Sequence, residues 1–249
     1  MTDTVDLLPS MAGDILATVR DEQPHVHCLT NIVAANISAN VLLAVGARPS
    51  MTDTPGEIKA FVASTDALLV NLGMLTNDRR ESILLAVETM AERNMPWVLD
   101  PVKIGTSPTR RKFAENLLLG RPAALKANRS EFSVLTAAPS ETVTACTGPV
   151  DRIEGGGQFV TISNGHELAD RVTAMGCAEG ALIAAFLAVH PDRFTATASA
   201  ILVFNVAAEI AAETAKGPGS FQSNLLDSLY SLDTQTIASR ARLERIQKS

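Results

Sequence analysis

The fold class is decided by the stretch DALLVNLGMLTNDRRESILLAVETMAERNMPWVLDPV, residues 66–102. It begins with the apolar run ALLV at 67–70, which is typical of a strand buried on both faces. Residues 77–93 follow, with apolar side chains recurring along one side of an expected helix. A second apolar run at 97–99 is stopped by Asp100-Pro101. Strand, helix and strand in this order form the repeating unit of a parallel sheet.

The same alternation continues through the first two-thirds of the chain. Strands are predicted at 26–29, 66–71, 97–99, 123–126 and 142–146. Helices are predicted around 11–19, at 32–45, from 55, at 77–93 and from 107 to 119. A hairpin is predicted from 150–153 and 159–162, and helices follow at 176–189, 195–214, 221–232 and 234–246. We therefore expect an α/β fold in one domain, 1–249, with a mostly parallel central sheet, helices on both faces and a helical C-terminal part.

Composition argues against several classes of protein. The chain has 249 residues, of which 46% are hydrophobic and 19% are charged, so a buried core is easy to build. The net charge is −6, and the most basic run is only Arg110-Arg111-Lys112, which argues against a nucleic-acid partner. The three cysteines, Cys28, Cys146 and Cys177, form neither a disulfide framework nor a C-x-x-C motif.

The first nine residues lack the basic and apolar regions of a signal peptide. No apolar segment looks long and uninterrupted enough to span a bilayer, and the run at 181–189 ends at His190-Pro191. We therefore expect a cytoplasmic protein without a membrane partner.

Polar and glycine-containing segments follow the predicted strands. In an open α/β sheet, ligands bind beyond the carboxyl ends of the strands. We therefore expect one edge of the sheet to be lined by residues 71–73, 100–102, 126–131 and 147–148 and by the helix start at 173–177.

The chemistry of these segments is coherent. Asp100 and Glu131 are carboxylates of the kind that hold Mg²⁺, directly or through water. Lys126 is suited to pair with a phosphate. Gly176-Cys177 opens a helix, where the N–H groups and the dipole favour an anion and would lower the pKa of the Cys177 thiol.

Each residue taken alone also has a structural interpretation. Asp100 precedes a proline and is equally consistent with a turn. Glu131 lies three residues after Asn128, which is the spacing of a capping box. An isolated cysteine such as Cys177 is more often a small buried hydrophobe, and an isolated lysine such as Lys126 is most often solvated.

Several motifs resemble those of one known family. The stretch Val26-His27-Cys28-Leu29-Thr30-Asn31 resembles the opening motif of that family. Further matches, in family order, lie at 42–51, 71–75, 98–102, 128–131, 147–148 and 217–222. Over nearly its whole length the chain thus resembles the hydroxyethylthiazole kinases of the ribokinase-like superfamily.

The resemblance implies a ribokinase-like fold and a homotrimer with thiazole pockets between neighbouring subunits. It also implies transfer of the ATP γ-phosphate, with Mg²⁺, to the hydroxyl of 4-methyl-5-(2-hydroxyethyl)thiazole, a salvage step toward thiamine. By motif position, Asn31, Met51 and Gly73 would lie at the thiazole pocket, and Ala174 would contact the substrate through its backbone.

The nucleotide side is implied in the same way. Lys126 falls where the family usually has an ATP-binding arginine, and Thr147 falls at a second ATP contact. Asp100 and Glu131 match acidic residues near Mg²⁺, and Cys177 matches the position at the hydroxyl that accepts the phosphoryl group.

The chain departs from the family pattern at the catalytic end. The usual Thr-Gly-Thr-Gly-Cys reads Thr173-Ala174-Met175-Gly176-Cys177, and the usual Arg-Gly-Asn reads Lys126-Ala127-Asn128. The segment 132–146 is short, so a crossover helix is expected to be missing or very short. We expect Ala174→Gly combined with Met175→Thr to raise turnover by restoring the anion-binding turn.

Three functions are therefore open at this point. The first is a working thiazole kinase. The second is a catalytically impaired or non-catalytic thiazole-binding homologue that kept the front pocket. The third is a kinase for another small alcohol with a pyrimidine or pyridoxal-like ring, against which the front motif at 26–31 argues.

Overall fold

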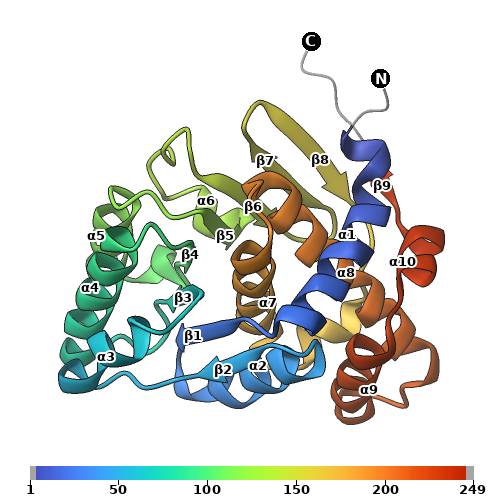
Figure 1. The fold of residues 1–249 in the computed structure, drawn as a ribbon, viewed down its shortest axis with the longest axis horizontal. Coiled ribbons are helices and arrows are strands. Elements are labelled where there is room, and N and C mark those ends of the chain that lie inside the picture. Colours follow the sequence, from blue (N-terminus) through green and yellow to red (C-terminus); the bar gives the residue numbers. More distant parts are fainter. Residues whose placement is uncertain (1–3, 245–249) are drawn as a thin grey trace.

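The computed structural model describes residues 4–244 (Figure 1). Its nine-stranded sheet has the order β2-β1-β3-β4-β5-β6-β7-β8-β9. The strands are β1 (His25–Leu29), β2 (Arg48–Ser50), β3 (Ala67–Asn71), β4 (Trp97–Asp100), β5 (Ala124–Asn128), β6 (Val143–Thr147), β7 (Asp151–Gly155), β8 (Gln158–Ile162) and β9 (Leu243–Glu244).

The α-helices are α1 (Thr4–Glu22), α2 (Ile32–Ala44), α3 (Pro55–Val62), α4 (Asn77–Glu92), α5 (Pro108–Leu118), α6 (Arg129–Phe132), α7 (Met175–Val189), α8 (Arg193–Thr214), α9 (Pro218–Ser231) and α10 (Thr234–Arg240). Two short 3₁₀ helices are η1 (Ile104–Thr106) and η2 (Glu167–Arg171). Most predicted elements are confirmed within a few residues, including the hairpin that β7 and β8 form.

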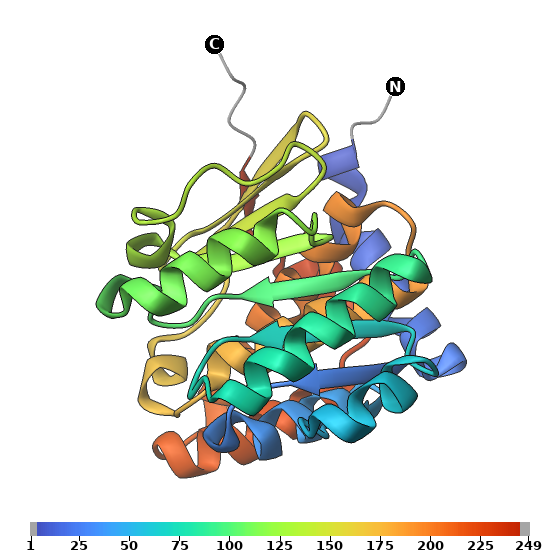
Figure 2. The ribbon, with the colours of Figure 1, turned by 90° about the vertical axis from the view of Figure 1, so that its left-hand side faces the viewer.

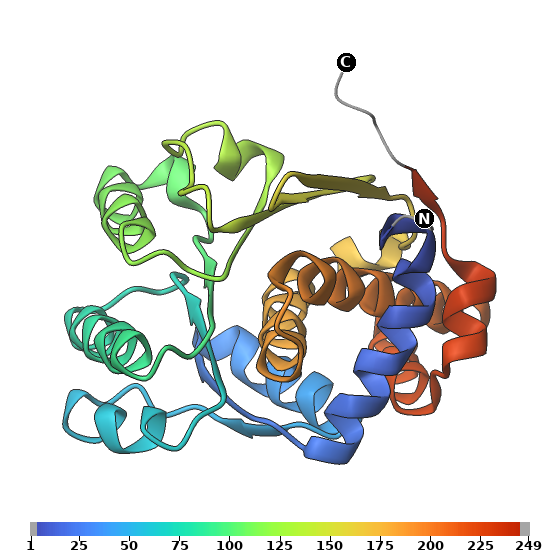
Figure 3. The ribbon, with the colours of Figure 1, turned by 45° about the horizontal axis from the view of Figure 1, so that its top comes forward.

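The six strands β1 to β6 run parallel, and their arrows point the same way in Figure 2. The last three strands, β7, β8 and β9, join antiparallel. Helices α3, α4 and α5 cover one face of the sheet, while α1, α2 and α7 to α10 lie on the other (Figure 3). The predicted α/β class, with helices on both faces and a helical C-terminal part, is confirmed.

The apolar helix α7 lies against the middle of the sheet and α8 packs beside it. Leu182, Ile183 and Phe186 of α7 are fully buried in the core of this face. In contrast to the sequence prediction, α8 has the length and apolar composition of a membrane span. However, 89% of that apolar window is buried inside the fold, as in the core helix of a globular protein.

The predicted helix at 234–246 is wrong beyond Arg240. The Asn164 side chain binds the backbone on both sides of Ala241. Its Nδ2 donates to Arg240 O at 2.9 Å, and its Oδ1 accepts from Arg242 N at 2.7 Å. The following residues then form β9 against β8, with Leu243 opposite Ile162. Tertiary contacts thus override a helix-like sequence, and residues beyond 244 lie outside the described part.

The connection from β5 to β6 is as short as the sequence predicts. Its helix, α6, is a single turn. The two strands nevertheless pair in parallel along their whole length, with Asn128 opposite Thr147. The short connection therefore keeps the end of β6 beside the end of β5.

Candidate active site

The carboxyl ends of the parallel strands form one edge of the sheet, and the predicted site residues lie along it. In the spatial order of the strands, they are Met51 after β2, Asn31 after β1, Gly73 after β3, Asp100 at the end of β4, Lys126 in β5 and Thr147 at the end of β6. The N-terminus of α7 lies over the middle of this row, because Cys177 contacts side chains from beyond β1 and from β3. The predicted edge is confirmed.

Asn71 connects the middle of the row. Its Oδ1 accepts from Asn31 Nδ2 and from the Gly73 N–H, both at 3.0 Å. Its Nδ2 donates to Asp100 Oδ2 at 2.8 Å and faces Cys177 Sγ at 3.2 Å. Asn71 is fully buried, so this one amide fixes four neighbours that come from four segments of the chain.

The space at Gly73 is also set by this network. A Cβ added at Gly73 would lie 2.8 Å from Asn31 Nδ2 and 3.0 Å from Asn71 Oδ1. A side chain here would therefore displace the amides that hold the site together.

Burial raises the pKa of Asp100 to about 6. The positive charge of Lys126 and the amide of Asn71 oppose this shift, while the Glu131 carboxylate adds to it. Burial also raises the pKa of the Cys177 thiol to about 11, and the Asp100 carboxylate adds to the rise. The expectation that the helix N-terminus lowers the Cys177 pKa is therefore wrong, and the thiol stays protonated at neutral pH.

Lys126 is buried and paired rather than solvated. Its ammonium donates to Gly176 O at 2.7 Å and lies 3.7 Å from Glu179 Oε2. Burial alone lowers the pKa of Lys126, but the carboxylates of Asp100 and Glu179 raise it above its ordinary value. Burial raises the pKa of Glu179, while the positive charge of Lys126 opposes this rise. Lys126 is therefore a fixed positive charge next to the N-terminus of α7.

Glu131 closes the capping box that the sequence predicts. Its Oε2 accepts from Asn128 N at 3.0 Å, and its own N–H donates to Asn128 Oδ1 at 3.0 Å. Its Oε1 accepts from Lys103 N at 2.7 Å. Its charge still reaches Asp100 and raises the pKa of that carboxyl group.

Asp100 and Glu131 are the carboxylates that would hold a Mg²⁺ ion at this edge, directly or through water. Asp100 and Glu131 repel each other, and their oxygens are the ligands that Mg²⁺ prefers. Among residues 4–244, no group of three or more His, Cys, Asp or Glu side chains is placed to hold a metal. Water and substrate oxygens would complete the coordination of an ion held here, as is usual for Mg²⁺ beside phosphates.

The turn before α7, where Ala174 replaces the glycine of the family pattern, has a strained backbone. Ala174 is the N-cap and has φ 65° and ψ 14°, a left-handed conformation that glycine adopts without strain. Met175 is buried in the core, while Gly176 is exposed. Ala178 is the first residue of α7 whose N–H bonds back to the turn, to Ala174 O at 3.0 Å. The N–H groups that precede it in α7 have no acceptor within the helix, which is the arrangement that an anion-binding helix start uses.

The remaining two predicted residues lie at the ends of the row. Met51 is half-buried and packs against the core on the α2 side. Thr147 is half-buried at the far end, next to Gly148, whose N–H donates to Asp151 Oδ1 at 2.8 Å. The structure thus brings Asn31, Gly73, Asp100 and Cys177 together, while Met51 and Thr147 lie at the two ends of the row.

A family model described as the hydroxyethylthiazole kinase family matches residues 16–141 and 133–235. The chain belongs to this family. It is similar to a probable hydroxyethylthiazole kinase of Agrobacterium fabrum, with 43% identity over 236 residues, 95% of this chain and 96% of the relative.

Solved structures agree with the family assignment. The hydroxyethylthiazole kinase protein from Pyrococcus horikoshii superposes with a TM-score of 0.90 at 36% identity, covering 95% of this chain and 99% of that one. A ribokinase-like superfamily protein from Enterococcus faecalis, 12% identical, superposes with a TM-score of 0.64 over 87% of this chain and 93% of its own. The predicted resemblance and the ribokinase-like fold class are confirmed.

Sequence reasoning missed two residues of this hydroxyethylthiazole kinase family site. Asn71 lay in a segment expected at the edge, but nothing in the sequence marks an asparagine as a hub. Glu179 did carry a signal, because it is the only charged residue in the apolar helix 175–189. A lone carboxylate in such a helix is expected to be buried and paired.

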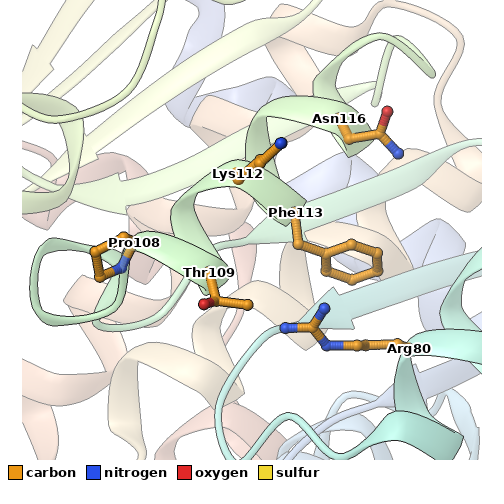
Figure 4. Close-up of a pocket in the computed structure, with 6 residues that line it drawn as sticks. All are labelled: Arg80, Pro108, Thr109, Lys112, Phe113 and Asn116. Carbon is orange, nitrogen blue, oxygen red and sulfur yellow. The ribbon is translucent and has the colours of Figure 1, made fainter.

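A hollow of about 420 Å³ lies between α4 and α5. Its lining residues are Arg80, Pro108, Thr109, Lys112, Phe113 and Asn116 (Figure 4). The Arg80 guanidinium carbon lies 5.3 Å from the centre of the Phe113 ring. None of the predicted site residues lines this hollow.

Proposed function

We propose that this chain is a hydroxyethylthiazole kinase, which transfers the γ-phosphate of ATP to the hydroxyl of 4-methyl-5-(2-hydroxyethyl)thiazole in thiamine salvage. The observation that carries the proposal is the order of residues along the sheet edge. Residues implied for the thiazole lie beyond β2, β1 and β3, residues implied for ATP lie on β5 and β6, and Asp100 lies between them.

The thiazole end is preorganised. Asn31 and Gly73 form a wall held by Asn71, Met51 supplies an apolar contact, and Ala174 contributes backbone from the opposite side. Substrate therefore meets groups whose positions are already fixed.

A second copy of the chain is proposed to cover this end. Ile32, Val33 and Met74 adjoin Asn31 and Gly73, and their exposed fractions are 77%, 58% and 56%. Large apolar side chains exposed around a binding site are typical of an interaction surface. They support the homotrimer with pockets between subunits that the family resemblance implies.

The nucleotide end carries charge. Lys126 contributes a fixed positive charge, and Thr147 offers a hydroxyl at the far end of the row. Asp100 and Glu131 would hold Mg²⁺, which when bound neutralises phosphate charge. Catalysis is then mostly positioning and charge neutralisation, as in phosphoryl transfer generally.

During transfer, the bond from the γ-phosphorus to the bridging oxygen breaks, and ADP leaves with the electron pair. The new bond forms to the substrate hydroxyl oxygen, whose O–H bond breaks and releases its proton to water. The N–H groups at the start of α7 donate to the oxygens of the transferring group. Cys177, the predicted catalytic residue, is proposed to act through its N–H and as a protonated thiol that shapes the acceptor pocket. A cytoplasmic location stays part of this proposal.

The proposal is tested by coupled ADP release from Mg·ATP, with calorimetry for the thiazole and for ATP separately. The matched control substrate is 4,5-dimethylthiazole, which lacks the hydroxyl and is expected to give no ADP. Thiazole binding without ATP binding or turnover would overturn the proposal in favour of a non-catalytic binding protein. Faster turnover on a pyridoxal-like or pyrimidine alcohol would instead assign a different substrate.

A further inference from the structure

The ammonium of Lys126 is committed to the N-terminus of α7. It donates to Gly176 O at 2.7 Å, and the absence of a side chain at Gly176 permits this approach, because a Cβ there would lie 2.8 Å from Nζ. The side chain of Lys126 is only 7% exposed. Lys126 thus touches the peptide group at the start of the helix from its buried side.

That peptide group joins Gly176 to Cys177. Its carbonyl accepts from Lys126, and its other end is the Cys177 N–H. A cation at the carbonyl polarises the peptide and makes its N–H a stronger donor. The Cys177 N–H belongs to the first turn of α7, where no intrahelical acceptor is available.

Glu179 holds the same ammonium from the other side. It lies three residues after Gly176, so its side chain and the Gly176 carbonyl lie on one side of the first turn. Its Oε2 is 3.7 Å from Lys126 Nζ, and both side chains are 7% exposed. In the described part of the chain, Lys126 forms its ion pair with Glu179. The Asp100 carboxylate lies farther away and raises the pKa of Lys126 through its charge.

We propose that Glu179 is a positioning residue, which holds the Lys126 ammonium on the Gly176 carbonyl and so strengthens the Cys177 N–H that receives the transferring phosphoryl group. The inference rests on the proposed function and deepens it. It assigns Glu179 a role in the chemical step, and it assigns Lys126 an action through the Gly176–Cys177 peptide.

The test is a double-mutant cycle with Glu179→Leu and Lys126→Met, both of similar size to the native residues. We expect Glu179→Leu to lower kcat about tenfold, as loss of part of an oxyanion-type donor does, with the KM for the thiazole changed less than about twofold. Glu179→Gln keeps an acceptor for the ammonium and is expected to restore most of the lost kcat. In the Lys126→Met background, Glu179→Leu is expected to change kcat by less than about twofold.

Two controls separate this role from a structural one. Glu209→Gln removes a carboxylate that pairs with Arg242 far from the site and is expected to leave kcat unchanged. Gly176→Ala pushes the ammonium aside without removing it and is expected to lower kcat as Lys126→Met does. A lower Tm with unchanged kcat in Glu179→Leu, or a kcat loss that adds fully to that of Lys126→Met, would overturn the inference.

Failure of the proposed function is distinguishable. If the native protein binds a non-hydrolysable Mg·ATP analogue without turnover, the proposed function fails. The inference is then tested by measuring the affinity for this analogue in the Glu179→Leu and Lys126→Met variants and in the double variant. Coupled effects on affinity would support it, and additive effects would overturn it. If the native protein neither turns over nor binds the analogue, both the proposed function and the inference fail.

Discussion

Asn71 and Asp100 are register partners on the neighbouring strands β3 and β4, and the Asn71 amide donates to the Asp100 carboxylate at 2.8 Å. The pairing places an amide hub directly beside the carboxylate proposed to hold Mg²⁺. The Asn31 side chain and the α7 N-terminus are tied to the same amide. The site therefore depends on a buried amide that links four other residues of the site.

Asn71→Ala is expected to lower the free energy of unfolding by about 3 kcal/mol, because it leaves several buried donors and acceptors without partners. It is also expected to lower kcat/KM by about two orders of magnitude, since Asp100 and Asn31 lose their orientation. Urea denaturation and steady-state kinetics measure the two effects. The control is Asn116→Ala at an exposed position of α5. Wild-type kinetics in Asn71→Ala would contradict the role of the hub.

Ala174→Gly is expected to raise stability by about 1 kcal/mol, because glycine adopts the left-handed conformation at φ 65° without strain. Ala178→Gly, in the regular part of the same helix, is the control and is expected to destabilise by at least about 1 kcal/mol. Thermal unfolding of the two variants measures the difference. Destabilisation by both substitutions would show that the turn is not strained.

Met175→Thr has opposite expected effects on stability and on turnover. Met175 is buried in the core, so its loss is expected to cost about 1–3 kcal/mol. Combined with Ala174→Gly it is still expected to raise kcat, because a less restricted backbone returns to the anion-binding turn. Steady-state kinetics below the unfolding temperature test this, with Ala174→Gly alone as the reference. An unchanged or lower kcat would count against the account of the turn.

His27 gives a stability that depends on pH. Burial lowers the pKa of His27 to about 4 from 6.5, and its ring bonds to Ser50 Oγ and Thr52 O. At His27 the unfolded chain therefore binds more protons between these two pH values, so this contribution is complete above pH 6.5 and is lost as pH falls toward 4. Its size is about 3 kcal/mol.

His27→Gln is expected to flatten this pH dependence, because the amide can keep a bond to Thr52 O without titrating. His190→Gln, at the end of α7, is the matched control and should retain the native slope. Urea denaturation at a series of pH values from 4 to 7 measures the slopes. A native slope in His27→Gln would exclude His27 as its source.

Glu131→Gln is expected to raise the Mg²⁺ concentration for half-maximal activity several-fold, since one of two carboxylates at the cation site loses its charge. It is also expected to cost about 1 kcal/mol of stability through the capping box. Magnesium titrations of activity measure the first effect, and Glu88→Gln on the surface is the control. An unchanged magnesium requirement would remove Glu131 from the cation site.

Much of the fold could be predicted because periodicity and turn residues act locally. The strand ends fixed the site edge, and the pairing of Asn128 with Glu131 predicted a capping box. The C-terminal strand could not be predicted, since it depends on Asn164, about 80 residues away in the sequence. The single-domain organisation stays a prediction.

Within the site, the sequence predicted where the residues lie better than it predicted their surroundings and pKa values. Asp100, Asn31 and Cys177 lie together as expected. The direction of the Cys177 pKa shift could not be predicted, because burial outweighs the helix N-terminus only once the fold is known. The pairing of Lys126 with Glu179 joins β5 to α7, and no local pattern encodes it.

The central claim is phosphoryl transfer to the thiazole alcohol, and ³¹P NMR of the product tests it most directly. Purified protein is incubated with Mg·ATP and 4-methyl-5-(2-hydroxyethyl)thiazole, and Asp100→Asn serves as the comparison. The account predicts a phosphate monoester formed in equal amount to ADP by the native protein and far more slowly by the variant. Bound thiazole with no monoester, or a monoester formed equally fast by Asp100→Asn, would contradict it.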